Sequence, residues 1–537
     1  MLSVSVLAGT VEAQPHHRLC DPAETDCRDI LIRHIRAEDI GLDVAFWFME
    51  DARFSSALAR AQARGVRVRV LMDSRANVDY PGNVFCLDQL RGAGIPMREK
   101  FSPGILHWKM MLFVGQNTVQ FSGANYSAEA FVPYEPYKAY VDEVIYFTDR
   151  PSYVDSFKTM FDRVWITEEG YRNYANVTTP QAAYGVTAID PELSFGPFES
   201  FRNRSLAAYS AETLGIDALM FRITDRAHTD RLIQVVQAGV RVRLVTEQLQ
   251  YRDTRRLWHA WNVDRLWAAG QQRLIGGAPG IQVRLRQHDG LSHEKLTILH
   301  GQSMSILGSS NWTSPSSDTQ LEHNLFTTNP AVYTWSRDHF ERKWFNRAPA
   351  AETRPFTPLP PDIPQIASPA PGANNLGLPV TLSWRAGAWA HRYDVYVGTD
   401  PNSMTKVVDD REFGPYDQSH TVTNLLPATV YYWRVVSRTM AGLERSTPIC
   451  SFKTAGGGAG LPMSSCLAAP AGAPDPIEVL APQDRNVPPP TDDGHLNPGT
   501  PLIPTPVGQI PSRTPSAHGT GTGRTAVPRR TETFTGD

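Results

Sequence analysis

The sequence predicts an α/β protein of two duplicated βαβ lobes packed about a pseudo-twofold axis, followed by an all-β sandwich and a disordered tail. Three observations support this fold class. Segments of the first 347 residues recur at nearly constant spacing, each copy has the pattern of strand, helix and strand, and prolines accumulate from about residue 348. At about 150 residues per domain, the 537 residues correspond to three or four domains.

The composition is that of a globular protein and disfavours some functional classes. Hydrophobic residues make up 41% of the chain and charged residues 20%, with a formal net charge of −3. This balance argues against a protein that coats nucleic acid or an anionic membrane through its overall charge. No apolar run reaches the roughly 18 residues that a membrane-spanning helix needs.

The amino-terminal segment, residues 1–16, predicts export. Its short apolar stretch ends in Val11-x-Ala13, a small-residue pattern typical of signal cleavage, and no positively charged region precedes it. We interpret it as a truncated signal segment and expect a secreted or periplasmic protein.

The five cysteines are too few for a disulfide scaffold and are not spaced as in a zinc ribbon. In an oxidising compartment Cys20 could pair with Cys27, and Cys450 with Cys466. Free thiols are the alternative that the sequence leaves open. Cys86 has no obvious partner in either case.

Two lobes are predicted from the repeat, over residues 17–180 and 181–347. Each copy reads as a buried strand, a helix of about a dozen residues, a glycine and a second apolar strand, an order that implies parallel strands and a right-handed crossover. The matching segments are 40–46 with 214–220, 52–64 with 227–238, and 65–71 with 239–245, at an offset of about 174.

Charged residues also repeat within these segments. We interpret the repeated aspartates as structural, because carboxylates at helix starts cap helices. The arginines of 66–70 and 240–244 alternate with valines, which favours a solvated strand face. The aspartates are Asp43, Asp51, Asp217 and Asp225.

A second set of repeated residues is polar, and a hydrophobic core does not explain it. Each copy has a His-x-Lys, an asparagine 18 residues after the histidine, and a later glutamate. Residues 105–113 predict a strand whose period of two places the histidine and lysine on one face, and the second copy does the same up to residue 299. The eight residues are His107, Lys109, Asn125, Glu143, His293, Lys295, Asn311 and Glu322.

Two such sets would converge if the lobes pack about a pseudo-twofold axis. Lysines and asparagine amides suit an anionic tetrahedral group, whose oxygens they neutralise. One imidazole could attack phosphorus while the other protonates the leaving oxygen, and a glutamate could accept the Nδ1 hydrogen of each histidine.

The paired His-x-Lys segments, each followed by a small-residue turn with asparagine and a downstream glutamate, resemble the phospholipase D superfamily over residues 28–347. The resemblance implies a phosphodiesterase or phosphatidyltransferase that uses a covalent phosphohistidine and needs no metal or other cofactor. It further implies that His107 and His293 are nucleophile and general acid in either order. The lysines and asparagines would bind the phosphoryl oxygens, and Glu143 and Glu322 would orient the histidines.

The sequence departs from the family motif His-x-Lys-x4-Asp. Val114 and His300 occupy the aspartate positions. Because that aspartate is mainly a supporting group in the family, we expect the chemistry to be intact. We interpret His300 as a surface residue at the end of its strand.

The carboxy-terminal part predicts no chemistry. Residues 348–371 predict a proline-rich linker, and 455–537 a disordered tail without a core. Between them, 372–454 show alternating strands with an early tryptophan and a Tyr-x-Trp-x-Val strand, and resemble a fibronectin type III module. Such a β-sandwich is usually a spacer or binding module.

We therefore expect an exported phospholipase D-type hydrolase acting on phospholipid or another phosphodiester, with peripheral membrane-surface contact. No oligomer is needed, because one chain carries both half-sites. Nucleic acid is a less favoured substrate. The alternatives are a nuclease of the same superfamily and a non-catalytic cell-surface binding protein.

Overall fold

The computed structural model describes residues 16–132, 140–253, 257–271, 277, 280–412, 418–457 and 466–467. The predicted signal segment, apart from residue 16, and most of the predicted disordered tail lie outside these residues and stay predictions. Over the described residues, no helix combines the length and the apolar character needed to cross a membrane.

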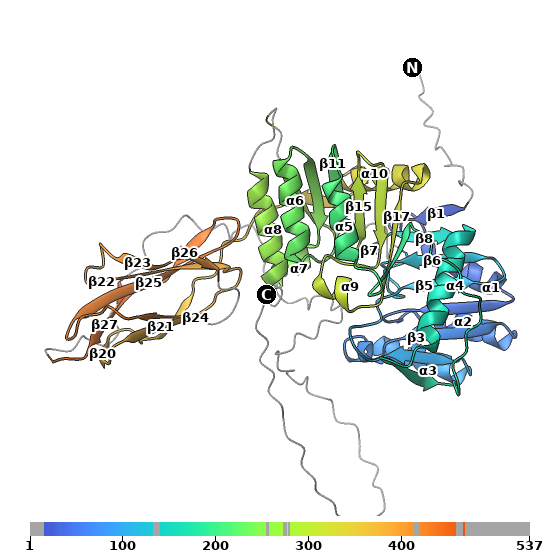
Figure 1. The fold of residues 1–537 in the computed structure, drawn as a ribbon, viewed down its shortest axis with the longest axis horizontal. Helices are drawn as coiled ribbons and strands as arrows, with labels where there is room; N and C mark the ends of the chain where they lie inside the picture. Colours follow the sequence, from blue (N-terminus) through green and yellow to red (C-terminus); the bar gives the residue numbers. More distant parts are fainter. Residues whose placement is uncertain are drawn as a thin grey trace, which may run out of the picture. The chain divides into compact units, whose positions relative to one another are not determined.

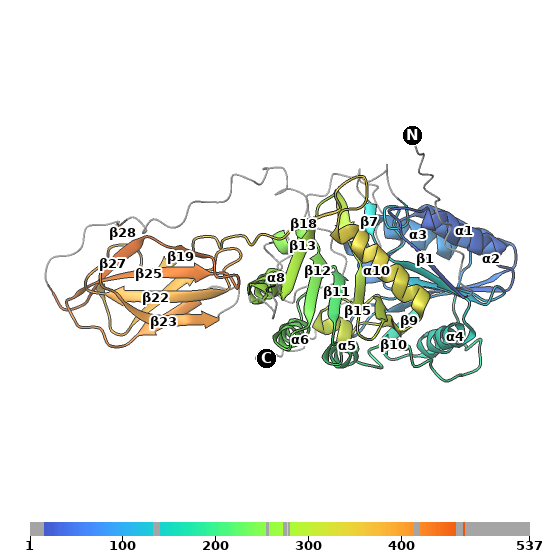
Figure 2. The same cartoon turned by 90° about the horizontal axis from the view of Figure 1, so that it is seen from above.

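The first lobe is an eight-stranded sheet with helices on its faces (Figures 1 and 2). The neighbouring strands β2, β3 and β4 are parallel, which confirms the predicted parallel strands. Its helices are α1 (Cys27–Ala37), α2 (Ala52–Ala63), η1 (Ser74–Val78), α3 (Pro81–Gly92) and α4 (Pro151–Ile166). In spatial order the strands are β1 (His17–Cys20), β8 (Ile145–Thr148), β6 (Thr118–Ser122), β5 (Met110–Phe113), β2 (Gly41–Ala45), β3 (Arg67–Met72), β4 (Met97–Lys100) and β9 (Tyr171–Ala175).

The second lobe repeats this sheet strand for strand, so the predicted duplication is confirmed in the fold. Its helices are α5 (Phe201–Ser210), α6 (Arg226–Gln237), α7 (Gln248–Arg252), α8 (Leu257–Gly270), α9 (Ser314–Asp318) and α10 (Pro330–Trp344). In spatial order the strands are β10 (Leu193–Gly196), β17 (Glu322–Thr327), β16 (Met304–Gly308), β15 (Lys295–Leu299), β11 (Gly215–Met220), β12 (Arg241–Thr246), β13 (Ile281–Arg286) and β18 (Thr353–Pro355).

One hydrophobic core joins the two lobes. It contains side chains of both central sheets, such as Leu112 and Leu296, together with Phe157 of α4 and Phe340 of α10. Each lobe has one further core, between its sheet and the helices on the other face of that sheet. Because apolar area from both lobes is buried in the shared core, the relative position of the lobes is fixed by packing.

Two of the four repeated aspartates cap helices, as predicted, and the other two lie within strands. The Asp51 carboxylate caps α2 by accepting a hydrogen bond from Arg53 N at 3.0 Å, and Asp225 caps α6 by accepting from Ala227 N at 2.9 Å. Asp43 and Asp217 lie on the central strands β2 and β11 and hold arginines. Capping and pairing of this kind explain why these residues recur without any role in chemistry.

The prediction of a solvated arginine face is wrong for one arginine of each copy. Arg69 is buried and bound to both carboxylate oxygens of Asp43 at 2.7 Å, and Arg243 pairs with Asp217 in the same way. The rings of α4 and α10 cover these guanidinium groups, with Phe161 centred 4.9 Å from Arg69. A charge on a strand can therefore be buried when its partner lies on the neighbouring strand.

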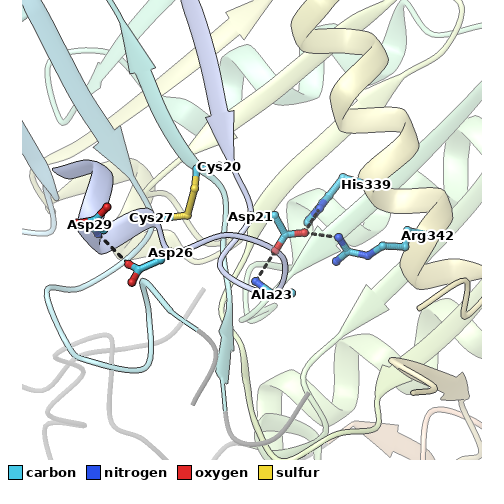
Figure 3. The surroundings of a disulfide bond; sticks show 8 residues. All are labelled: Cys20, Asp21, Ala23, Asp26, Cys27, Asp29, His339 and Arg342. Atoms are coloured by element: carbon cyan, nitrogen blue, oxygen red, sulfur yellow. Dashed lines mark hydrogen bonds and ion pairs between the residues drawn. A yellow bond between two sulfur atoms is a disulfide. The ribbon is translucent and has the colours of Figure 1, made fainter. Parts of the chain in front are cut away.

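The first cysteine pair is closed as a disulfide, Cys20–Cys27, and it borders a charged contact between the lobes (Figure 3). Asp21, next to Cys20, accepts from Ala23 N and lies 2.9 Å from Nδ1 of His339 and 2.5 Å from Nη1 of Arg342, both on α10. Cys450 and Cys466 form the second disulfide, and Cys86 is buried and unpaired among the described cysteines. The structure thus chooses between the two alternatives that the sequence left open.

The carboxy-terminal region is all-β over the residues described, and it encloses a core that includes Trp384 and Trp433. Its two main sheets are β19-β21-β24 and β20-β27-β25-β22-β23, with β26 beside β25 and β28 beside β27. The strands are β19 (Gln365–Ser368), β20 (Ala373–Leu376), β21 (Val380–Arg385), β22 (Arg392–Gly398), β23 (Thr405–Glu412), β24 (Gln418–Val422), β25 (Val430–Arg438), β26 (Glu444–Ser446), β27 (Ile449–Thr454) and β28 (Cys466–Leu467).

Candidate active site

The two lobes exchange backbone hydrogen bonds at the points where the repeated polar residues begin. Strand β14 (Gly290–Ser292) of the second lobe pairs in parallel with β7 (Tyr140–Asp142) of the first. The reciprocal contact is a parallel bridge between Leu106 and Leu321. The exchange therefore occurs twice, once on each side of the pseudo-twofold axis.

This exchange explains why the predicted strand over residues 105–113 is shorter in the structure. Strand β5 begins only at Met110, because His107 N donates to Leu321 O of the other lobe at 3.0 Å instead of joining the ladder of its own sheet. In the second copy His293 N donates to Asp142 O, also at 3.0 Å, and β15 begins at Lys295.

The histidine–glutamate pairs are crossed between the lobes. Glu322 directly follows Leu321, so the backbone bridge places its carboxylate 2.8 Å from Nδ1 of His107. On the other side Glu143 directly follows Asp142 and binds Nδ1 of His293. Both pairs are buried. Each carboxylate engages Nδ1, so the nitrogen of each ring that does not face its glutamate is Nε2.

A second layer of hydrogen bonds holds Glu322. Ser309 Oγ donates to Glu322 Oε2 at 2.5 Å, and Ser309 N donates to His323 O at 2.9 Å. His323 Nε2 in turn accepts from Lys109 N at 3.3 Å. Burial, together with Lys109 and His107, lowers the pKa of His323 to about 3, so this ring is neutral and acts as an acceptor.

Positive charge is concentrated around His293. Lys109 and Lys295 are both buried, and Lys295 Nζ lies 2.7 Å from Nε2 of His293. Burial, followed by the charges of Lys295 and Lys109, holds the pKa of His293 well below its usual range. Such buried ammonium groups favour an anionic ligand, because its charge offsets the cost of removing them from water.

The two asparagines occupy equivalent places in the two lobes. Asn125 follows β6 and is fixed by a bridge between Tyr126 and Met49, and Asn311 follows β16 and is fixed by a bridge between Trp312 and Ile223. Both asparagines are buried. The turn of the first copy needs glycine at position 123, because a Cβ there would lie 2.8 Å from Glu143 Oε2 and 3.1 Å from Lys295 Cδ.

Sequence reasoning missed Arg222, a buried residue whose charge lowers the pKa of His293 further. Its Nε donates to Gln250 Oε1 at 3.0 Å. The available signal was the repeat itself, because at the offset of 174 Arg222 matches Phe48 of the first copy. A guanidinium in place of a phenyl ring is a change that core packing does not explain. Sequence reasoning also missed that Ser309 contacts Glu322 and that His323 contacts Lys109.

The interpretation of His300 as a surface residue is wrong. Its Nε2 lies 2.6 Å from Asp217 Oδ2 and its Nδ1 3.0 Å from the Tyr333 hydroxyl. Val114, the other residue at the motif's aspartate position, follows β5 and packs near Gly41. His300 therefore belongs to the buried Asp217–Arg243 pair rather than to the surface.

A cavity of about 580 Å³ leads to the site and is lined by residues of both lobes. Of the eight predicted site residues, it touches His293 and Asn125. Within the described residues, no cluster of three or more His, Cys, Asp or Glu side chains is arranged to hold a metal ion.

Parts of this chain are similar to known proteins. Mitochondrial cardiolipin hydrolase of Homo sapiens is 30% identical over 147 residues, 27% of this chain and 52% of that protein, and its Xenopus tropicalis counterpart is 29% identical over 113 residues, 21% and 46%. The chain thus spans about half the length of these curated relatives. The structure of phosphatidylserine synthase from Haemophilus influenzae Rd KW20 aligns with a TM-score of 0.50 at 15% identity, covering 64% of this chain and 87% of that one, which is a likeness of fold.

The family described as "Cardiolipin synthase, PLD-like domain" matches this chain twice, over residues 31–165 and 210–344, which together make up half of its length. The matched ranges coincide with the two structural repeats. The chain belongs to this family of PLD-like domains, a branch of the phospholipase D superfamily, and carries the domain in two copies.

Proposed function

We propose that the protein is a phosphodiesterase that hydrolyses or transfers phosphatidyl groups through a covalent phosphohistidine. The observation that carries the proposal is the crossed pairing of His107 with Glu322 and of His293 with Glu143. Two imidazoles oriented through Nδ1, beside buried lysines, are suited to a double displacement at phosphorus. The family resemblance to a cardiolipin hydrolase supports a lipid phosphodiester as substrate.

In the first step Nε2 of one histidine attacks phosphorus, the bond from phosphorus to the leaving alcohol breaks, and the other histidine gives its Nε2 proton to the departing oxygen. In the second step that histidine takes a proton from water or an acceptor alcohol, whose oxygen displaces the phosphohistidine nitrogen. Lys109, Lys295 and Arg222 would stabilise the negative charge that builds on the phosphoryl oxygens, with help from the asparagine amides. All groups return to their starting state, and neither step is an oxidation or a reduction.

The test is product analysis with mixed phospholipid vesicles in the presence of ethanol and EDTA. Wild type should release phosphatidic acid and form phosphatidylethanol, and His107→Ala and His293→Ala should form neither. The exposed His16 provides a control, because His16→Ala should retain full activity. Quenching during turnover and mapping the phosphorylated peptide would assign the nucleophile to His107 or His293. A folded wild type that acts on no lipid, and acts on nucleic acid instead, would refute the lipid assignment.

We also propose that the protein acts outside the cytoplasm. The disulfides Cys20–Cys27 and Cys450–Cys466 support this, since both are stable in an oxidising compartment. Alkylation of the protein from fractionated cells should label one cysteine, Cys86, and only after unfolding. We further propose that residues 372–454 are a fibronectin type III-like spacer or binding module, which the two sheets around Trp384 support.

A further inference from the structure

The cavity beside His293 has a chemical character that the phosphoryl chemistry alone does not require. Four of its lining residues carry carboxylates, and two aromatic rings form part of its wall. These residues come from five separate segments of the two lobes. They are Glu50, Glu129, Glu247 and Asp289, with Phe48 and Tyr80.

The carboxylates outweigh the positive charge in the lining. Arg286 lines the cavity, but its guanidinium is buried. It donates to Asp142 Oδ2 at 2.7 Å and to two backbone carbonyls. Glu50, Glu129 and Asp289 are exposed to solvent. Glu247 is buried, where burial raises its pKa to about 7, and its oxygens accept from Leu249 N and Ser292 N. The negative charge that faces an incoming ligand therefore comes mainly from the three exposed carboxylates.

The charge of Glu129 disfavours the charged form of Glu50. Although Glu50 is exposed overall, partial burial of its carboxylate and then the charge of Glu129 raise the pKa of Glu50 above its usual value, while Gly82 N donates to its Oε1 at 3.1 Å. A cation between the two carboxylates would remove this repulsion. The rings of Phe48 and Tyr80 are stacked with centroids 3.6 Å apart, and the face of such a ring attracts a cation as well.

The duplication shows that this arrangement is confined to one copy. At the offset of 174, Phe48 and Glu50 of the first lobe correspond to Arg222 and Thr224 of the second. The first lobe thus supplies a ring and a carboxylate where the second supplies a guanidinium. The site has a positive pole at Arg222 and the buried lysines and a negative pole at Glu50 and Glu129, which matches a ligand with a phosphate and an ammonium group.

We propose that Glu50, Glu129 and the Phe48–Tyr80 stack form a subsite for a positively charged alcohol, so that the protein prefers phosphodiesters of amino alcohols. The inference rests on the proposed function, since it places the head group of the same substrate beside His293. It adds a specificity that the eight repeated residues do not provide. The same subsite would also favour an amino alcohol as the acceptor in transfer.

The first experiment compares kcat/KM of the full chain for vesicle-borne phosphatidylethanolamine and phosphatidylglycerol. Wild type should prefer phosphatidylethanolamine, and in the double variant Glu50→Gln/Glu129→Gln the ratio of kcat/KM for phosphatidylethanolamine over phosphatidylglycerol should fall about tenfold. Glu169→Gln is the matched control, because Glu169 is exposed and outside the cavity lining. An equal loss on both lipids, or a wild-type preference for phosphatidylglycerol, would overturn the inference.

A binding measurement separates this inference from the proposed function. Calorimetric titration of the full chain with phosphocholine and with glycerol phosphate needs no turnover. Phosphocholine should bind about tenfold more tightly to wild type, and the advantage should disappear in the double variant. Equal affinity for the two ligands would overturn the inference even in an active phosphodiesterase. Selective binding by a protein without lipid activity would instead refute the catalytic proposal and support the subsite.

Discussion

The crossed histidine–glutamate pairs make a prediction that an uncrossed active site does not. Replacing Glu322 by glutamine keeps the size of the side chain and removes its charge. Because Glu322 lies 2.8 Å from Nδ1 of His107, the substitution should weaken the orientation of a histidine in the other lobe. The corresponding change on the other side is Glu143→Gln, which should act on His293.

The expected size of the effect follows from the geometry of this contact. Both partners are fully buried, and a hydrogen bond to a charged group contributes about 1.5–3 kcal/mol. If this stabilisation is lost in the transition state, kcat falls roughly 10- to 100-fold. The glutamine can still accept a hydrogen bond from Nδ1, which is why the expected loss is smaller than that of removing the histidine.

Two assays together test the crossing. Steady-state rates with phospholipid vesicles give the loss of kcat, with Glu169→Gln as a control for removal of a surface carboxylate. Nitrogen-15 spectra of histidine-labelled protein then report which ring each glutamate contacts. Glu322→Gln should move the Nδ1 signal of His107 and leave that of His293 in place. If Glu322→Gln moved the His293 signal instead, the pairs would lie within lobes and the reasoning from the backbone exchange would fail.

Three further predictions concern charge and stability. Lys295→Met should lower kcat by about 10²–10³-fold with the fold intact, because it removes a buried ammonium beside His293. The control Lys158→Met should not lower kcat. Equal losses in the two variants would contradict the assignment. Arg69→Met should cost about 3–5 kcal/mol of unfolding free energy in denaturant titrations, since it leaves Asp43 buried without its main partner, and the exposed Arg33→Met should cost little. Asp21 predicts a pH dependence: although burial alone would raise its pKa, His339 and Arg342 hold that pKa far below the unfolded value, so its contribution is present above about pH 4 and is lost as the pH falls. The stability difference between wild type and Asp21→Asn should therefore shrink below pH 4, and a constant difference from pH 7 to pH 3 would contradict this account.

Much of the fold was predictable because the duplication leaves a repeated signal. The strand–helix–strand pattern around Gly65 and Gly239 predicts parallel strands, and the structure has them as β2 and β3 and as β11 and β12. Both glycines have positive φ, where other residues are strained, so their recurrence has a local cause. Local backbone preferences of this kind are visible in a sequence.

The crossing of the pairs was not predictable for a physical reason. Spacing along the chain placed Glu143 near His107 and Glu322 near His293 as readily as the reverse. The choice depends on the parallel bridge between Leu106 and Leu321, which are 215 positions apart, and on the core shared by the lobes. Arg69 was misjudged for the same reason, because its burial depends on the rings of α4 and not on the alternation of its own strand.

Duplication by itself gives two equivalent histidines, yet the proposed reaction needs one to attack while the other protonates. The asymmetry must then come from residues that the two copies do not share. Positions 48 and 222 supply it on one pair of equivalent sites, with a phenyl ring in the first lobe and a buried guanidinium in the second. Glu50 of the first lobe and Thr224 of the second are another pair of equivalent positions with different side chains. Under the proposed mechanism, the repeated residues would displace at phosphorus, and the residues that break the repeat would set the direction of the substrate in the site.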